Sequence, residues 1–280
     1  MSDENLAEIR NEKAKKIQHP KGKLTAYERL NLLLDEGSFS EIDQHVASDE
    51  NPEGEAVITG TGTIHGRPVF VFSEDFSVMG GSLGEVVAKK ILKIMDHALE
   101  ARAPIIGIKD SGGARIQEGI SSLFGYAQIF KKNVEASGKV PQISVVVGPS
   151  AGGAVYSPAL TDFIFQVKDI GQLYVTGPAV VKTVTGEDVT FEELGGVEAH
   201  GTKSGVTHQV CETEEQAFEE IRYLMSFLPQ SSSQKPPMFI TEDEPSRVIE
   251  SLDSFIPENR NQPYDMEKII LDIVDDGEHY

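Results

Sequence analysis

The sequence is poor in residues that build covalent or metal cross-links. It contains one cysteine, Cys211, and no tryptophan. A single cysteine forms no disulfide framework and no cysteine-based zinc site, which fits a reducing compartment. The seven histidines are scattered without the close spacing of metal ligands, so no metal site is expected.

Long apolar runs are also missing. No stretch approaches the ~18 apolar residues of a membrane span. The acidic start, Met1 to Asn5, lacks the apolar core of a signal peptide. The sequence therefore predicts a soluble, cytoplasmic protein without a membrane span.

Basic residues are few. The chain has 25 Lys and Arg against 45 Asp and Glu, a formal net charge of -20. Such a charge argues against binding nucleic acid or an anionic membrane, whereas a small nucleotide-bearing ligand would need only a local basic cluster. The 280 residues are 39% hydrophobic, enough for a substantial core in one large or two small domains.

The N-terminal third predicts helices followed by a hairpin. Residues 5–18 read as a polar helix with a thin apolar strip. Thr25 and Glu28 match a capping box before a leucine-rich helix that we expect to stop at Gly37. Residues 55–74 then have the alternation and turn residues of a β-hairpin.

The centre of the chain predicts parallel strands. Apolar runs at 104–109 and 142–147 have the length and β-branched content of buried strands. One helix precedes Pro104, and a second lies between the strands, carrying apolar residues from Ile120 to Val134. A long helix between two strands indicates a crossover, so the fold class is α/β.

The C-terminal part predicts a domain boundary. A helix is expected over 213–228, and residues 231–237, rich in Ser and Pro, read as a linker. The predicted domains are therefore 1–230 and a linking segment, 231–280, with one amphipathic helix near 266–274.

Each central strand runs into glycines. The first is followed by Gly112, Gly113 and Ala114, and the second by Gly152 and Gly153. A strand, a glycine turn and a helix N-terminus expose backbone N–H groups that can stabilise a carbonyl oxygen as it gains negative charge. Glycines needed only for tight turns are the alternative, and either motif alone would favour it.

Ser150 offers a competing interpretation. Residues 148–152 fit the G-x-S-x-G pattern of a hydrolase nucleophile, and His200 or His208 follows acidic candidates in the required order. The pattern is short and arises easily by chance. A serine hydrolase therefore remains a second hypothesis.

Four long segments carry a resemblance to a known family. They closely resemble the N-terminal half of biotin-dependent acyl-CoA carboxyltransferases, a family that includes the propionyl-CoA carboxylase beta subunit, the large transcarboxylase subunit and the methylmalonyl-CoA decarboxylase alpha subunit. The segments are Lys21–Leu30, Asp75–Ser82, Asp110–Gly119 and Gly148–Ala159, extended by Thr176–Pro178, Val189–Thr190, Glu193–Gly196 and His200.

The resemblance implies a crotonase/ClpP-like ββα spiral that binds a coenzyme A thioester. By motif, the backbone at Gly112, Gly113, Ala114, Gly152 and Gly153 would hold the thioester carbonyl as an enolate forms. The substrate-binding residues implied are Ser73, Phe76, Met79, Gly80, Gly81, Arg115, Ala151 and Tyr156. Relatives often have cysteine in place of Ser150, which weakens its case as a nucleophile.

The resemblance also implies partners. Biotin would reside on a separate carrier protein, linked to a biotin carboxylase subunit. Family members continue into a second half that holds biotin, so we expect this chain to be a fragment, a split-gene subunit or a truncated product, inactive in carboxyl transfer alone. A homo- or hetero-oligomer is expected, and a non-catalytic assembly subunit is a third hypothesis.

Overall fold

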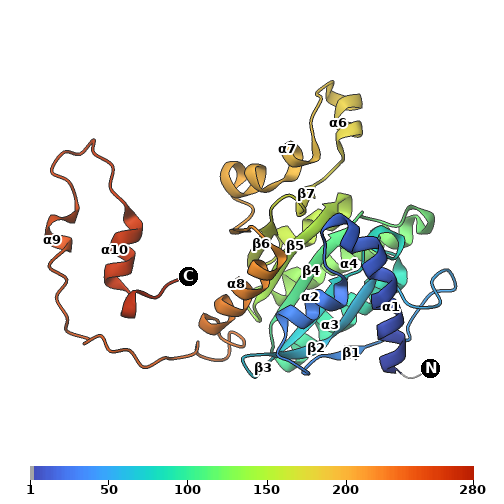
Figure 1. The fold of residues 1–280 in the computed structure, drawn as a ribbon, viewed down its shortest axis with the longest axis horizontal. Coiled ribbons are helices and arrows are strands. Elements are labelled where there is room, and N and C mark those ends of the chain that lie inside the picture. Colours follow the sequence, from blue (N-terminus) through green and yellow to red (C-terminus); the bar gives the residue numbers. More distant parts are fainter. Residues whose placement is uncertain (1–2) are drawn as a thin grey trace. The chain divides into compact units, whose positions relative to one another are not determined.

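A single mixed sheet forms the centre of the larger of two compact units (Figure 1). The computed structural model describes residues 3–280, so Met1 and Ser2 of the predicted acidic start lie outside the described residues. The strands are β1 (Ser40–Ile42), β2 (Val57–Ile64), β3 (Arg67–Glu74), β4 (Ile105–Ser111), β5 (Gln142–Ala151), β6 (Phe163–Val167), β7 (Gln172–Tyr174) and β8 (Gln209–Cys211).

The strands lie in the order β1-β2-β3-β4-β5-β6-β8, and β7 pairs with the end of β5. The first three are antiparallel, whereas β3 to β6 and β8 are parallel. The predicted α/β class and parallel central pair are confirmed. The two-residue turn between β2 and β3 has positive φ at His65 (52°) and Gly66 (71°), as a tight hairpin turn requires.

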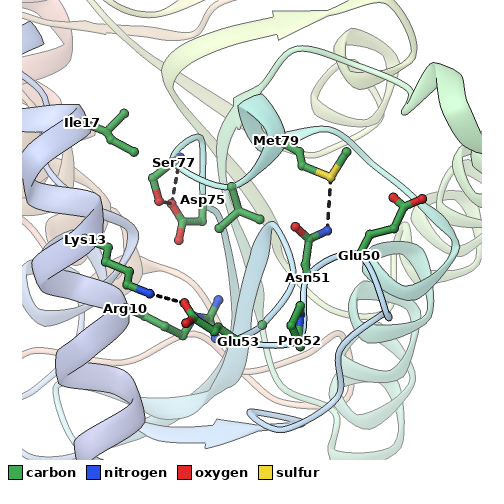
Figure 2. A pocket seen from close by; sticks show the side chains of 12 residues that line it. Arg10, Lys13, Ile17, Glu50, Asn51, Pro52, Glu53, Asp75, Ser77 and Met79 are labelled. Atoms are coloured by element: carbon green, nitrogen blue, oxygen red, sulfur yellow. Dashed lines mark hydrogen bonds and ion pairs between the residues drawn. The ribbon is translucent and has the colours of Figure 1, made fainter.

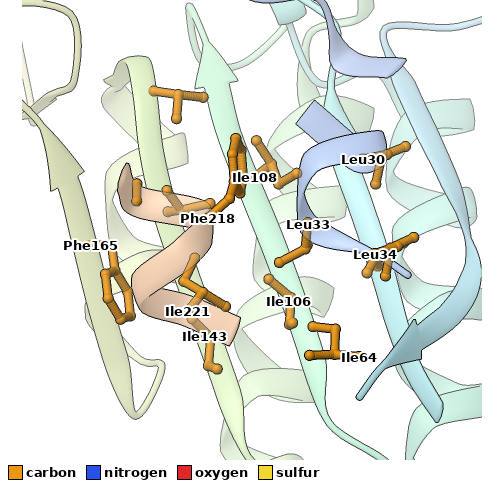
Figure 3. Close-up of a cluster of buried hydrophobic side chains, with 14 of the residues drawn as sticks. Leu30, Leu33, Leu34, Ile64, Ile106, Ile108, Ile143, Phe165, Phe218 and Ile221 are labelled. Carbon is orange, nitrogen blue, oxygen red and sulfur yellow. The ribbon is translucent and has the colours of Figure 1, made fainter. Parts of the chain in front are cut away.

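Helices cover both faces of the sheet. The α-helices up to residue 227 are α1 (Asp3–Gln18), α2 (Ala26–Leu33), α3 (Glu85–Ala101), α4 (Ile120–Ala136), α5 (Tyr156–Ala159), α6 (Pro178–Thr185), α7 (Phe191–Gly195) and α8 (Glu214–Phe227), of which α6 and α7 project away from the sheet (Figure 1). On one face, α2 and α8 supply Leu30, Leu33, Phe218 and Ile221, which pack with Ile108 of β4 (Figure 3). On the other face, α3 and α4 build a second apolar cluster with Phe72 and Ile105.

The start of α2 follows the prediction, and its end does not. Thr25 Oγ1 accepts from the Glu28 amide and the Glu28 carboxylate accepts from the Thr25 amide, so the capping box is present. The helix ends at Leu33 rather than at Gly37, because Leu34 turns into an extended conformation (ψ 159°).

The first helix, α1, differs from the prediction of a thin apolar strip. Over residues 6–18 the buried positions are Arg10, Ala14 and Gln18, while Ile17 is exposed. The two polar side chains are buried because they bond to groups beneath the helix. Arg10 donates to the Glu55 carbonyl (2.9 Å), and Gln18 donates to the Asp110 carboxylate (3.1 Å).

The apolar residues of α4 divide between two surroundings. Ile129 is buried, whereas Ile120, Leu123, Phe124 and Val134 are 59–82% exposed. The inward side of the helix includes small or polar residues, Ser122, Gly125 and Asn133. The apolar periodicity therefore predicted the helix correctly, but it did not predict which side of the helix faces the sheet.

The chain divides into two compact units, Met1–Pro236 and Pro237–Tyr280. The second unit contains α9 (Leu252–Phe255) and α10 (Met266–Ile273), the latter at the position predicted for an amphipathic helix. Within the described residues, no helix is both long enough and apolar enough to cross a membrane.

Ile108 gives a test of the core beneath α2 and α8. Because Ile108 is fully buried, Ile108→Ala should lower the free energy of unfolding by about 2–5 kcal/mol. Ile120→Ala is the matched control, since Ile120 is 82% exposed, and its effect should stay within about 0.5 kcal/mol. Urea denaturation measures both, and equal effects would contradict the packing described here.

Lys90 on α3 gives a second test, based on pH. Its ammonium is buried and donates to the Val57 carbonyl (3.2 Å), and burial lowers the pKa of Lys90 to about 8. The folded protein therefore binds fewer protons than the unfolded chain above pH 8, so the penalty of burying this charge falls as pH rises.

Relative to a Lys90→Met variant, the wild type should gain about 2 kcal/mol of unfolding free energy between pH 7.5 and 9.5. Urea denaturation of both proteins at the two pH values measures this difference. Parallel pH profiles would show that Lys90 keeps an ordinary pKa.

Candidate active site

The predicted glycine loops lie side by side at the ends of β4 and β5. The two strands are neighbours, and Ser111 pairs with Ser150 at their ends. Just beyond, a Cβ on Gly113 (φ +104°) would lie 2.7 Å from the Ala151 carbonyl oxygen. Only glycine permits this backbone approach, so the structure brings the two predicted loops together.

Most amides of the first loop are already bonded. The Gly112 amide donates to the Gly80 carbonyl (2.9 Å), and the Gly113 amide donates to Ser111 Oγ (3.1 Å). The Arg115 amide donates to the Leu83 carbonyl (2.9 Å). Among the described residues, the Ala114 amide has no acceptor, so it is the free donor of this loop.

The second loop starts a helical segment. Gly152 and Gly153 are the first two residues of a 3-10 helix, Gly152–Val155, which continues into α5. Amides at these positions have no carbonyl partner within the helix. Gly152 has φ +56°, and a Cβ there would meet only the Val175 carbonyl, at 3.8 Å. A Cβ on Gly153 would lie 2.6 Å from the Tyr126 ring.

The predicted substrate-binding segment 73–82 supports the first loop. Gly80 accepts the Gly112 amide, and a Cβ on Gly81 would lie 2.1 Å from the Asp110 carbonyl oxygen. Ser73 is fully buried on β3, and its hydroxyl has no hydrogen-bond partner among the described residues. Phe76 is half-buried.

Two lysines flank Phe76. The ammonium groups of Lys21 and Lys23 lie 4.9 and 5.1 Å from the centre of its ring. The Lys23 ammonium is buried and paired with Asp110 (2.7 Å), so of these two lysines only Lys21 adds uncompensated positive charge beside Phe76.

Met79 lies in the wall of a pocket of about 390 Å³ between α1 and the loops 50–54 and 75–79 (Figure 2). The Asn51 amide donates to Met79 Sδ (3.1 Å), and Lys13 points to Glu53, with which it pairs. The charged lining is Arg10, Lys13, Glu50, Glu53 and Asp75. Its two cations are outnumbered by carboxylates, so the pocket does not favour a phosphate group.

The other predicted residues have different surroundings. The guanidinium of Arg115 is 1% exposed and pairs with Glu55 (2.9 Å) and Glu118 (2.8 Å). Because two carboxylates already neutralise its charge, Arg115 is better placed to support the loop than to contact a substrate. Ala151 is half-buried between the loops. Tyr156 is 47% exposed, with its ring edge-on to Phe130.

Beneath the loops is a buried charge network that no sequence pattern had indicated. The Asp110 carboxylate is fully buried and bonds to Arg29 (2.9 Å), Lys23 (2.7 Å) and Gln18 (3.1 Å). Arg29, also fully buried, pairs with Glu214 at the start of α8 (2.6 Å). Burial acts to lower the pKa of Arg29, but the charges of Asp110 and Glu214 outweigh it and raise the pKa, so Arg29 stays charged.

A second buried pair lies next to it. Lys109 Nζ is 3.5 Å from the Glu74 carboxylate, and both side chains are almost fully buried. Burial raises the pKa of Glu74 and lowers the pKa of Lys109, because each charge has lost its water. Sequence patterns gave no signal for either network, because the partners come from distant elements.

The serine hydrolase hypothesis is not supported. Ser150 is fully buried, and its hydroxyl donates to the Ala154 carbonyl (3.0 Å). His200 bonds to Ser204 and to the Leu173 carbonyl, and His208 bonds to the Ile164 amide. Neither imidazole can therefore act as the base of a Ser150 triad as these side chains are placed.

Among the described residues, no group of three or more His, Cys, Asp or Glu is placed to hold a metal ion.

The fold and the paired glycine loops define a class of protein, the carboxyltransferases with a crotonase-like fold. A transcarboxylase 12S structure, with methylmalonyl-coenzyme A bound in a hexamer assembly, matches 99% of this chain and 57% of its own at a TM-score of 0.90 and 44% identity. The beta subunit of geranyl-CoA carboxylase from P. aeruginosa matches 98% of this chain and 52% of its own at a TM-score of 0.73 and 29% identity.

Sequence comparison agrees with this class. The carboxyl transferase domain family matches residues 17–280, so the chain belongs to that family. It is 54% identical to the propionyl-CoA carboxylase beta chain of Roseobacter denitrificans, over 94% of this chain and 53% of the relative. It is 52% identical to the methylmalonyl-CoA decarboxylase subunit alpha of Veillonella parvula, over 99% of this chain and 57% of the relative. The chain thus spans about half the length of these relatives.

The surroundings of Ser150 predict its chemical behaviour. Because its hydroxyl is buried and bonded to a carbonyl, a fluorophosphonate probe should not label the folded protein, and the Ser150→Ala variant should give the same result as the wild type. Mass spectrometry of both proteins after incubation with the probe measures this outcome. Labelling of the wild type that disappears in Ser150→Ala would revive the hydrolase hypothesis.

Proposed function

We propose that this chain is the acyl-CoA-binding half of a biotin-dependent carboxyltransferase. The reaction moves a carboxyl group between carboxybiotin and the α-carbon of a short-chain acyl-CoA, with propionyl-CoA or methylmalonyl-CoA as the favoured substrate. The single observation that carries the proposal is that two loops in backbone contact both offer free amides. These are the Ala114 amide on one loop and the first amides of the Gly152–Val155 helix on the other.

The chemistry assigned to these residues is electrostatic. Loss of the α-proton, or of a carboxyl group from the α-carbon, leaves an enolate whose charge rests on the thioester oxygen. Preorganised amides stabilise that oxygen more than the neutral carbonyl, and one such donor typically contributes ~3 kcal/mol to the lowering of the barrier. Hence Ala114 and Gly152–Gly153 are proposed to hold the oxygen, while Gly112 and Gly113 shape the loop.

In this proposal, biotin stays on a separate carrier protein and supplies the activated carboxyl group. The residues of this chain act on the thioester, and a complementary carboxyltransferase half supplies the biotin side of the site. The proposed partners are therefore that half, the carrier with its biotin carboxylase subunit, and further copies in an oligomer. Residues 1–230 form the proposed acyl-CoA domain, and 231–280 the segment that leads to the second half.

Gly152 provides the test. A Cβ at this position would meet only the Val175 carbonyl oxygen, at 3.8 Å, so a Leu side chain has room here, and in this proposal Gly152→Leu blocks the approach of the thioester to the amides. Affinity for propionyl-CoA, measured by calorimetry, should fall by more than about tenfold, a loss of about 1.4 kcal/mol of binding free energy.

Gly138→Leu is the matched control. Gly138 also has a left-handed backbone (φ +71°) and open space around it, so both variants carry the same type of backbone strain, about 1–2 kcal/mol. The control should bind propionyl-CoA like the wild type. A wild-type chain that binds no acyl-CoA would favour the alternative of a non-catalytic assembly subunit.

A further inference from the structure

The pairing between β4 and β5 is interrupted directly below the glycine loops. Lys109 pairs with Val146, but Ser111 pairs with Ser150, so residues 147–149 of β5 face Asp110 alone. A bulge of this kind interrupts the ladder and leaves backbone groups without their usual partners. It also sets how far each glycine loop extends beyond the sheet.

Buried side chains bond to the backbone on both sides of Asp110. On the β5 side, the Val147 carbonyl within the bulge accepts from Arg29 Nη2 (3.2 Å). On the β3 side, the pairing with β4 ends at Ser73 and Ile108, and the Asp110 amide donates to the Glu74 carboxylate (2.9 Å). Charged residues thus bond to backbone groups on both strands at this point.

Arg29 connects three elements at this point. Its Nε donates to Glu214 (2.6 Å), its Nη1 to Asp110 (2.9 Å) and its Nη2 to the Val147 carbonyl. Asp110 lies two residues before Gly112 of the first glycine loop, and Val147 lies five residues before Gly152 of the second. Only the fork of a guanidinium reaches these separate acceptors, because lysine presents its donors from one atom.

The Asp110 carboxylate packs directly against β5. A Cβ on Gly148 would lie 1.9 Å from Asp110 Oδ1 and 2.5 Å from Lys23 Nζ. A displacement of Asp110 toward β5 would therefore press on the β5 backbone ahead of the second glycine loop.

We propose that Arg29 is a positioning residue that, through Asp110 and Val147, sets the relative register of the two glycine loops, so that the Ala114 and Gly152–Gly153 amides share one oxygen. This inference rests on the proposed function. Arg29 itself touches no substrate and acts only through the two strand ends.

The test uses Arg29→Lys, which keeps the charge and removes the fork. The ligand is propionyl-CoA labelled with ¹³C at the thioester carbonyl, whose NMR shift reports polarisation by the amides. We expect the bound carbonyl to shift downfield in the wild type. Arg29→Lys should lose at least half of that shift while its dissociation constant changes by less than about threefold, because in this proposal Arg29 makes no contact with the ligand.

Arg222→Lys is the matched control. Arg222 lies on α8 and bonds to Asp35 (2.9 Å) and to the Leu33 carbonyl (2.8 Å), away from the bulge. It should keep the full carbonyl shift. A loss of shift in both variants would show general loosening of α8 against α2 and would overturn the positioning role.

A ligand-free measurement separates this inference from the proposed function. Hydrogen exchange over 110–115 and 149–154 should be faster by at least about tenfold in Arg29→Lys, and unchanged in Arg222→Lys, because the loops lose their anchor. Should Arg29→Lys fail to fold, Asp110→Asn, which keeps the shape and removes one charge, is examined in the same way.

The outcomes are distinct. Normal exchange and a full carbonyl shift in Arg29→Lys would overturn the positioning role and leave the proposed function standing. No carbonyl shift in the wild type, despite binding, would contradict the proposed function, and the inference would fall with it.

Discussion

The fully buried guanidinium of Arg29 is the contact on which the rest of the structure depends. It joins the end of β4, the end of β5 and the start of α8 through Asp110, the Val147 carbonyl and Glu214. An unpaired charge at this depth would be very costly, so each partner is needed once the others are present. The two strand ends that Arg29 holds lead into the glycine loops, so their positions fix where each loop starts.

The apolar core and the buried charges have different roles. The isoleucines and leucines of the two clusters supply most of the stabilisation, and many arrangements of similar volume would do so. Charges such as Asp110 and Glu74 accept only particular partners in particular directions, so they restrict the backbone at one edge of the sheet. That edge carries the candidate active site.

Sequence patterns predicted the elements with strong local signals. The capping box at Thr25, the hairpin of β2 and β3 and the two central strands follow from residues close together in the chain. The short strands β1 and β8 have no such pattern, because they are strands only by pairing with β2 and β6.

For the site, the glycine motifs located both loops, but they could not show which amides are free. That depends on Gly80 and Ser111, which occupy the amides of Gly112 and Gly113. Arg29 was hidden for a similar reason. In a helix it reads as one more exposed basic residue, and its burial follows from acidic partners 81 and 185 residues away in the chain.

The separation of Arg29 from Glu214 also has a consequence for biosynthesis. At about 5–20 residues per second, a ribosome needs roughly 10–40 seconds to add the 185 residues between them. Until α8 emerges, Arg29 lacks one of its two carboxylate partners, and the sheet edge at the glycine loops stays incompletely anchored. The ion pair between Arg29 and Glu214 thus forms only after the last helix of the first unit has been translated.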